Sequence, residues 1–347
     1  MENTINKDQL IEDEYDYVEG TDVNDPIEVN LKEVLSNVVK RDTIMQHDDL
    51  MKATSQSAVV QVCCAQSGYT ANMTPLKYRE FFKMSNSETS SYENRKMTYK
   101  TIYDKISSTS ITDWQMTFEE WLKATSVYDM ETLCYGIFCA TYQNDGRYTY
   151  TCPRCKNQVE VILDHNSIIH RADTTDMSKL SDKIVKESDT IDKLQQYSLV
   201  LKEPTTIQLS NSKIVFELRI PSLYDMLALL KAFSDEELEA IESSNEKFSL
   251  TIMLTTKNVY IPINDKNQLD KYSKYSTKKD IQTVLDNLPP LDFAQLKRYI
   301  IRMLNKYHVS YSIDNVKCTH PSCDHVVDTI PLNLEDILFA HIASLIW

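Results

Sequence analysis

Four cysteines in two closely spaced pairs are the residues of this chain whose types and spacing could do chemistry. Cys152 and Cys155 lie in the segment TCPRC, and Cys318 and Cys323 lie in KCTHPSC. Two residues between cysteines let both sulfur atoms of a pair face one ion, and four residues still allow a chelating loop. Zn²⁺ binds such thiolates in a closed tetrahedron. The sequence therefore predicts one Zn²⁺ site with four thiolate ligands.

Two alternatives to this ligand set stay open. His320 lies inside the second pair and could replace one thiolate, or the site could have lost its metal and kept small buried thiols. Four protein ligands leave no open position for water, so the predicted zinc is structural and not catalytic. The other four cysteines are predicted to be small buried hydrophobic residues: Cys63, Cys64, Cys134 and Cys139.

No pattern in the sequence indicates an active site. The chain has only four glycines, and their scattered positions exclude a glycine-rich phosphate loop. It contains no Ser-His-Asp arrangement, no H-E-x-x-H pair and no nucleophile elbow. We therefore expect a protein that is not an enzyme.

Composition and charge narrow the class of protein further. The chain has 347 residues, 42% of them hydrophobic, which predicts a globular protein. Its net charge of −14 does not favour binding to nucleic acid. Residues 1–28 hold ten acidic residues against Lys7 alone and are predicted to form an acidic arm. No signal peptide and no apolar run of about 18 residues is present, so we expect neither secretion nor a membrane span. Synthesis in the cytoplasm would keep the thiols reduced and able to bind metal.

The elements that must position the cysteines predict an α+β fold that is mostly helical. Apolar residues at helical spacing predict a helical domain over residues 29–145, with 51–64 continuing its bundle. Alternating segments around the cysteine pairs predict a zinc ribbon, with residues 146–173 as its first half and 308–347 as its second half followed by a C-terminal helix. Residues 174–307 are predicted to be a mainly helical insertion, and residues 172–190, around its start, are predicted to be a polar linker. Within the insertion, we expect a β-hairpin around Asn211.

The order of these segments resembles one protein family, over residues 115–340. The segment WLKATSVYDMETLCYGIFCATY precedes TCPRC, the segment RIPSLYD follows it, and LEDIL follows the second cysteine pair. This order is similar to that of the baseplate hub assembly proteins of T-even-like contractile-tailed bacteriophages. The resemblance implies a non-enzymatic virion protein, made in the host cytoplasm, with a structural zinc. Its implied partners are other baseplate or tail-tube proteins, with no small-molecule substrate, nucleic acid or membrane.

The resemblance also bears on two local features. It implies a helix over residues 248–258, although the β-branched residues there favour a strand. Lys156 and Asp324 stand where the family usually has a glycine after each cysteine pair.

A second class of function is a zinc-ribbon module in a transcription or nucleic-acid machine. Such a module needs clustered basic residues to bind phosphates. The basic side chains near the first cysteine pair are balanced by Asp145, Glu160 and Asp164, so charge disfavours this alternative.

Overall fold

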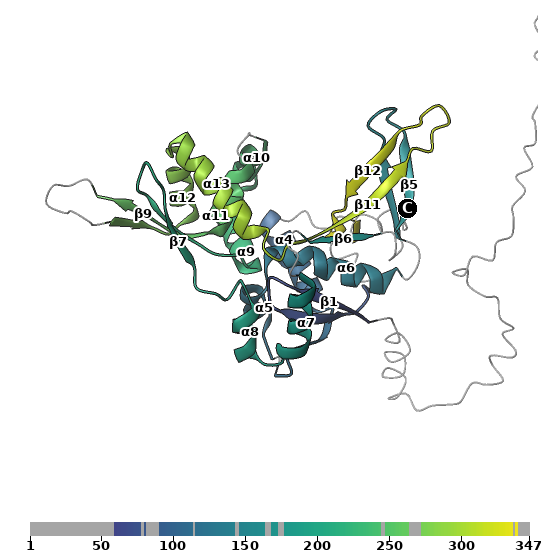
Figure 1. The fold of residues 1–347 in the computed structure, drawn as a ribbon, viewed down its shortest axis with the longest axis horizontal. Coiled ribbons are helices and arrows are strands. Elements are labelled where there is room, and N and C mark those ends of the chain that lie inside the picture. Colours follow the sequence, from purple (N-terminus) through teal and green to yellow (C-terminus); the bar gives the residue numbers. More distant parts are fainter. Residues whose placement is uncertain are drawn as a thin grey trace, which may run out of the picture. The chain divides into compact units, whose positions relative to one another are not determined.

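The computed structural model describes most of the chain beyond residue 58. It describes residues 59–77, 80, 90–113, 115–142, 146–163, 168–172, 177–243, 247–263, 272–335 and 337–338. All of these belong to one compact unit, Ser57–Trp347, drawn in colour in Figure 1. The predicted acidic arm, residues 1–28, lies outside the described residues.

A three-stranded antiparallel sheet and the helices next to it hold the first hydrophobic core. The strands, in the order β1-β2-β3, are β1 (Val60–Cys64), β2 (Tyr69–Met73) and β3 (Ile106–Thr109). The helices are α4 (Ser91–Tyr103), α5 (Phe118–Ala124), the 3₁₀-helix η1 (Val127–Asp129), α6 (Met130–Thr141), α7 (Met177–Glu187) and α8 (Ile191–Tyr197). Apolar side chains alternate along β1 and β2, and those of Val62, Ala71 and Met73 are buried against α6. Trp121 of α5 is also fully buried, and its indole N–H donates to the Tyr69 hydroxyl at 3.0 Å.

A four-stranded antiparallel sheet carries the second core. Its strands, in the order β10-β9-β8-β7, are β7 (Thr205–Gln208), β8 (Val215–Leu218), β9 (Thr256–Pro262) and β10 (Tyr272–Tyr275). Its helices are α9 (Leu223–Ala232), α10 (Asp235–Ser243), α11 (Lys247–Thr255), α12 (Lys278–Asp286) and α13 (Pro290–Leu304). Phe216 and Val259 from the sheet pack with Ile252 and Ile300 from the helices, and all four are buried. Val127 and Met226 contact both cores, so the two cores adjoin.

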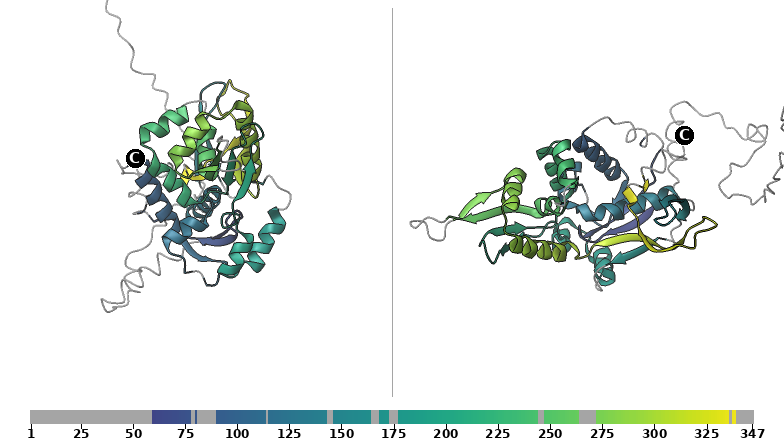
Figure 2. Two further views of the ribbon diagram at one scale, coloured as in Figure 1. Left: turned by 90° about the vertical axis from the view of Figure 1, so that its left-hand side faces the viewer. Right: turned by 90° about the horizontal axis from the view of Figure 1, so that it is seen from above.

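Two further sheets carry the cysteine pairs. The strands β4 (Gly146–Thr151) and β5 (Gln158–Leu163) form a two-stranded sheet. The strands β6 (Ile169–Ala172), β11 (Val309–Lys317) and β12 (Val326–Pro331) form a three-stranded sheet in the order β12-β11-β6. The β4–β5 and β11–β12 hairpins lie side by side, as Figures 1 and 2 show.

The predicted fold class, mostly helical with a zinc ribbon, is wrong. The described residues form four antiparallel sheets. The sheet β1-β2-β3 lies in a segment expected to be helical, and β10-β9-β8-β7 lies in the insertion expected to be mainly helical with one hairpin. The cysteines cluster, but their two hairpins belong to different sheets and do not make one ribbon. Residues 60–64 form β1 where the sequence predicts a helix, because periodicity does not distinguish a short apolar run in a buried strand from one in a buried helix.

Other local predictions had mixed outcomes. The hairpin around Asn211 is confirmed by the pairing of β7 with β8. Part of the expected linker, residues 177–187, is instead α7, which buries Ile184. The helix expected over 248–258 is confirmed up to Thr255, and β9 begins at Thr256. The first part of the segment is therefore helical as implied, and the second part is extended as its strand propensity favours.

Gly68 closes the β1–β2 turn at a position that no other residue fits. Its φ is +80°, and a Cβ atom would lie 2.6 Å from the backbone nitrogen of Ser198. We expect Gly68→Ala to lower the free energy of unfolding by about 3 kcal/mol, because the backbone strain adds to a clash with backbone that cannot turn away. The measurement is urea unfolding of the purified variant.

Gly136→Ala provides the matched control for Gly68→Ala. A Cβ at Gly136 would lie 2.6 Å from Cγ of Met73 and 2.8 Å from Cγ1 of Val62, so it also crowds the core. The atoms that it meets belong to side chains, however, and φ of Gly136 is not positive, so the variant lacks the backbone strain of Gly68→Ala. A loss at Gly68 no larger than the loss at Gly136 would contradict this account of the turn.

Candidate metal centre

The tips of two hairpins bring the four predicted cysteine ligands together. Cys152 follows β4 directly, and Cys155 lies in the turn that leads to β5. Cys318 follows β11, and Cys323 comes shortly before β12. The first cysteine of each pair donates its backbone N–H to the carbonyl two residues beyond the second cysteine, Asn157 at 2.8 Å and His325 at 2.9 Å. The two turns are therefore built alike despite their different lengths.

The arrangement of the four sulfur atoms fits one tetrahedral ion. All four Sγ atoms lie within 4.8 Å of one another. Cys152 and Cys323 are 4.0 Å apart, and Cys155 and Cys318 are 3.5 Å apart, each measured between Sγ atoms. Zn–S bonds of about 2.3 Å in a tetrahedron would separate the sulfur atoms by about 3.8 Å. Hence the four thiols lie close enough to hold a metal ion.

Backbone N–H groups point at these sulfur atoms and favour their charged form. The N–H groups of Cys155 and Arg154 bond to Cys152 and, despite its burial, lower the pKa of the Cys152 thiol to about 6. The N–H of His320 lies 3.5 Å from the Sγ of Cys318. Such N–H donors around thiolates are the outer-shell contacts that hold metal ligands in place.

Cys318 and Cys323 resist ionisation when no cation is bound. The His320 N–H stabilises a thiolate at Cys318, but burial and the hydrogen bonds shared with Cys155 and Cys152 raise the pKa of Cys318 to about 12. The pKa of Cys323 is also raised, although the His325 N–H bonds to its sulfur. A divalent cation would favour the thiolate form of these cysteines, because its charge compensates for several thiolates at once.

The other sequence candidates have simpler roles. The His320 ring lies outside the group of four sulfur atoms, and its Nδ1 is 3.1 Å from the Ser322 hydroxyl. Lys156, which replaces the usual glycine, adopts the left-handed conformation of glycine with φ of 62°. Among the remaining cysteines, Cys63 is half-buried and the other three are buried: Cys64, Cys134 and Cys139.

Sequence reasoning missed a buried polar cluster around Asp129. Asp129 is 3% exposed, and its Oδ2 accepts the N–H of Ser67 at 2.7 Å and the Ser67 hydroxyl at 2.6 Å. Its Oδ1 accepts the N–H of Gln66 at 3.4 Å. The Gln66 side chain donates to the carbonyl groups of Leu304 and Lys306 at 2.8 and 3.0 Å. The cluster therefore joins the β1–β2 turn and η1 to the end of α13.

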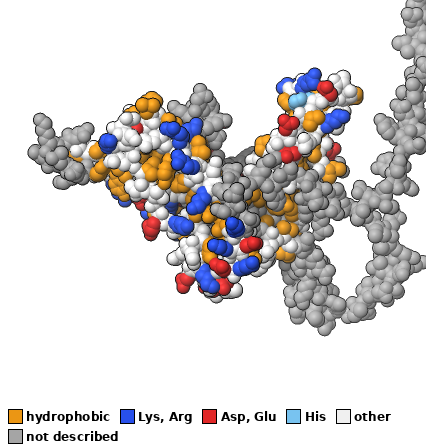
Figure 3. Space-filling view, viewed as in Figure 1, with side chains coloured by type: hydrophobic (Ala, Val, Ile, Leu, Met, Phe, Trp, Pro, Cys, Tyr) orange, Lys and Arg blue, Asp and Glu red, His pale blue; other side chains and the backbone are white. Residues whose placement is uncertain are grey.

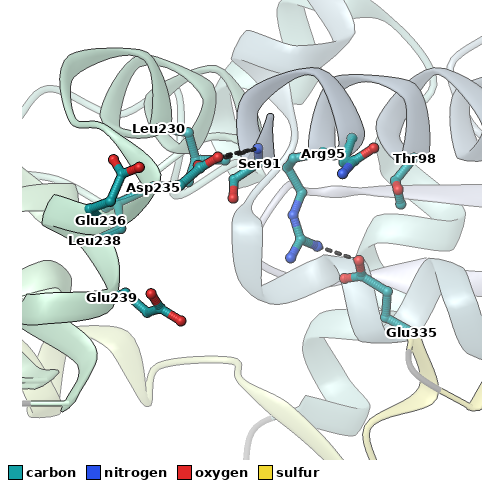
Figure 4. Close-up of a pocket in the computed structure, with 10 residues that line it drawn as sticks. Ser91, Arg95, Thr98, Leu230, Asp235, Glu236, Leu238, Glu239 and Glu335 are labelled. Atoms are coloured by element: carbon teal, nitrogen blue, oxygen red, sulfur yellow. Dashed lines mark hydrogen bonds and ion pairs between the residues drawn. The ribbon is translucent and has the colours of Figure 1, made fainter. Parts of the chain in front are cut away.

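A polar hollow of about 550 Å³ lies between α4 and α10. Figure 4 shows Arg95 pointing toward Glu335, with which it forms an ion pair, and Asp235 accepting the N–H of Ser91. Glu236 and Glu239 also line it. The ion pair and the contact with Ser91 explain the charges of Arg95, Glu335 and Asp235 as links between elements. No nucleophile with an adjacent base lies among the residues that line the hollow.

Comparisons with known proteins do not identify a family for this chain. The chain matches no protein-family model, and neither the comparison with curated proteins nor that with solved structures finds a match. The search for membrane spans, made over the described residues, finds no helix that is both long enough and apolar enough to cross a bilayer.

Proposed function

We propose that the four cysteines hold one structural Zn²⁺ that fastens the β4–β5 hairpin to the β11–β12 hairpin. The cluster of four sulfur atoms within 4.8 Å is the observation that carries this proposal. Four thiolates in a tetrahedron suit zinc, and they leave no position for a reacting water molecule. Two polar contacts between the tips are weak: the exposed ion pair of Arg154 with Asp324, and a hydrogen bond of 3.4 Å between Asn157 and Thr319. Because an exposed pair contributes little, the ion would be the main link.

We further propose that the chain is a non-enzymatic protein of a contractile phage baseplate hub, acting through protein contacts. Support comes from the role of the segments that carry the resemblance. In VYD, Asp129 holds the buried cluster described above. In RIPSLYD, Arg219 pairs with Asp225, and Ser222 forms a β-bridge to Ser126. In LEDIL, the N–H of Leu334 donates to Glu131 at 2.8 Å. The segments that carry the resemblance thus hold elements of the fold together, which is the role expected of them in an assembly protein without a catalytic centre.

Coexpression tests this proposal. The chain is produced together with the tail-tube and baseplate proteins encoded beside its gene, and the products are examined by sedimentation and electron microscopy. We expect the chain to sediment with baseplate intermediates. Omission of the chain should stop those intermediates at an earlier stage.

Two results would contradict the proposal. The first is a set of neighbouring genes without tail proteins, together with a chain that sediments alone. The second is formation of complete baseplates in its absence. Elemental analysis of the same material checks the metal separately, with about one zinc per chain expected.

A further inference from the structure

Three adjoining hollows form a continuous track across the described part of the chain. The first hollow, of about 500 Å³, lies between α4, α5 and α9. The second, of about 400 Å³, shares Lys123 and Tyr224 with the first. The third, of about 340 Å³, shares Lys202 and Arg219 with the second and ends on α13. Because consecutive hollows share lining side chains, we treat them as one surface and call it the cationic track.

The charge of the track is opposite to that of the chain. Eight Lys and Arg residues and two Glu residues line it, whereas the whole chain has a net charge of −14. Arg219 is paired with Asp225, and Lys257 with Glu217. The other six cationic residues are exposed: Lys96, Lys123, Lys202, Lys231, Arg302 and Lys306. The track therefore keeps an excess of positive charge after its own ion pairs are counted, and it attracts an acidic ligand.

Apolar side chains lie between these cations. Leu122 and Leu227 line the first hollow, and Ile220 and Met303 line the third. Tyr224, at the junction of the first two hollows, is 48% exposed. Figure 3 shows Lys and Arg side chains next to hydrophobic ones on the face that it presents. A ligand that fills the track thus needs apolar groups as well as negative charge.

We propose that the cationic track binds an acidic segment of a partner protein, with its carboxylates at the cations and its apolar side chains in the hollows. The aromatic rings of the track favour a protein segment over single-stranded nucleic acid. The ammonium groups of Lys96, Lys100 and Lys123 lie over the rings of Tyr92, Phe118 and Tyr224, at 5.8, 5.5 and 5.4 Å. A lysine ammonium group thus lies over one face of each of these rings, where a nucleic-acid base would otherwise stack. The proposal goes beyond the baseplate assignment and does not depend on it.

Binding measurements on the full chain test the proposal. The probe is a fluorescent peptide in which Glu alternates with Leu and Tyr. It is compared with a polyglutamate peptide and a single-stranded oligonucleotide, both of the same charge. We expect the mixed peptide to bind most tightly, and its binding to weaken with salt because the charges are exposed.

Matched variants locate the binding site. The double variant Lys202→Glu with Lys306→Glu is expected to weaken binding of the mixed peptide by about tenfold or more, since rim charges steer and hold a charged partner. The control, Lys183→Glu with Lys274→Glu, makes the same charge change at exposed lysines that do not line the track. Tyr224→Ser should weaken binding of the mixed peptide more than binding of polyglutamate.

Several outcomes would overturn the proposal. One is tighter binding of the oligonucleotide than of the mixed peptide, and another is no binding of the mixed peptide at low salt. Equal losses in the track and control variants would place the effect in total charge and not in the track. Unchanged circular dichroism and metal content confirm that the variants are folded.

Discussion

Cys152→Ser and Cys318→Ser are each expected to abolish stoichiometric metal binding and to lower the free energy of unfolding by about 5 kcal/mol. Serine does not supply the soft, charged ligand of a thiolate, and the ligand-binding free energy of a structural site is also folding free energy. Buried residues of both hairpins belong to the first hydrophobic core, including Tyr150, Val159 and Val316. Release of the two tips should therefore destabilise the packing of this core as well as the two turns. Elemental analysis and urea unfolding measure the two effects.

Two controls separate metal loss from ordinary thiol replacement. Cys63→Ser removes a half-buried thiol outside the group of four sulfur atoms, and it should keep about one zinc per chain. His320→Ala should also keep the metal, because its ring bonds to Ser322 outside that group. Loss of zinc in His320→Ala would favour the histidine alternative. Wild-type protein purified anaerobically without any bound metal would refute the site altogether.

The cysteine site was predictable because its information is local. The spacing within each pair and the alternating residues beside it are visible in short windows of sequence, and each pair lies at the tip of a hairpin. That these hairpins belong to separate sheets was not predictable from pattern: β4 and β5 form a sheet of their own, while β11 pairs with β12 and β6. Sheet membership depends on contacts between residues far apart, and no local propensity specifies them.

The α11–β9 junction shows how local preference and context divide a segment. Strand propensity alone would make residues 248–258 extended, yet α11 continues to Thr255. There the hydroxyl of Thr255 donates to the carbonyl of Thr251 at 2.9 Å, and that of Thr256 donates to Ile252 at 2.7 Å. Threonine bonds of this kind satisfy carbonyl groups at a helix end, so the β-branched residues that favour a strand also help to end the helix.

The buried cluster at Asp129 gave no local signal of its contacts. Its partners Gln66 and Ser67 lie more than 60 positions earlier in the chain. The carbonyl of Leu304, to which Gln66 donates, belongs to a residue of the second core. Only the resemblance drew attention to the segment that contains Asp129. The energetic weight of this carboxyl group follows from its burial, since a buried polar cluster is costly unless all its members are bonded.

Replacing Asp129 with alanine is expected to lower the free energy of unfolding by about 4 kcal/mol, because two backbone N–H groups lose their buried acceptor. Those groups belong to Gln66 and Ser67, both fully buried. The Ser67 hydroxyl loses an acceptor as well, although its oxygen still accepts the N–H of Ser126 at 2.8 Å. The measurement is urea unfolding of the variant against the wild type. A cost below about 1 kcal/mol, typical of a surface substitution, would show that the cluster does not hold these elements together.

Asp129→Asn is the matched control for Asp129→Ala, and it adds a dependence on pH. Asparagine keeps one carbonyl oxygen for the Ser67 N–H and should cost less than alanine. Burial, opposed by hydrogen bonds from Ser67 and Gln66, raises the pKa of Asp129 to about 6. In the unfolded chain this pKa is about 3.9, so the folded state binds the proton more tightly. The stability of the wild type relative to Asp129→Asn is therefore greatest below pH 4, and it should fall by about 3 kcal/mol as the pH rises from 4 to above 6. Both proteins keep all four cysteine ligands, so acid release of the metal cancels in this difference. A difference that stays constant between pH 4 and 7 would mean that Asp129 titrates as an ordinary carboxyl group and that its burial is relieved by water.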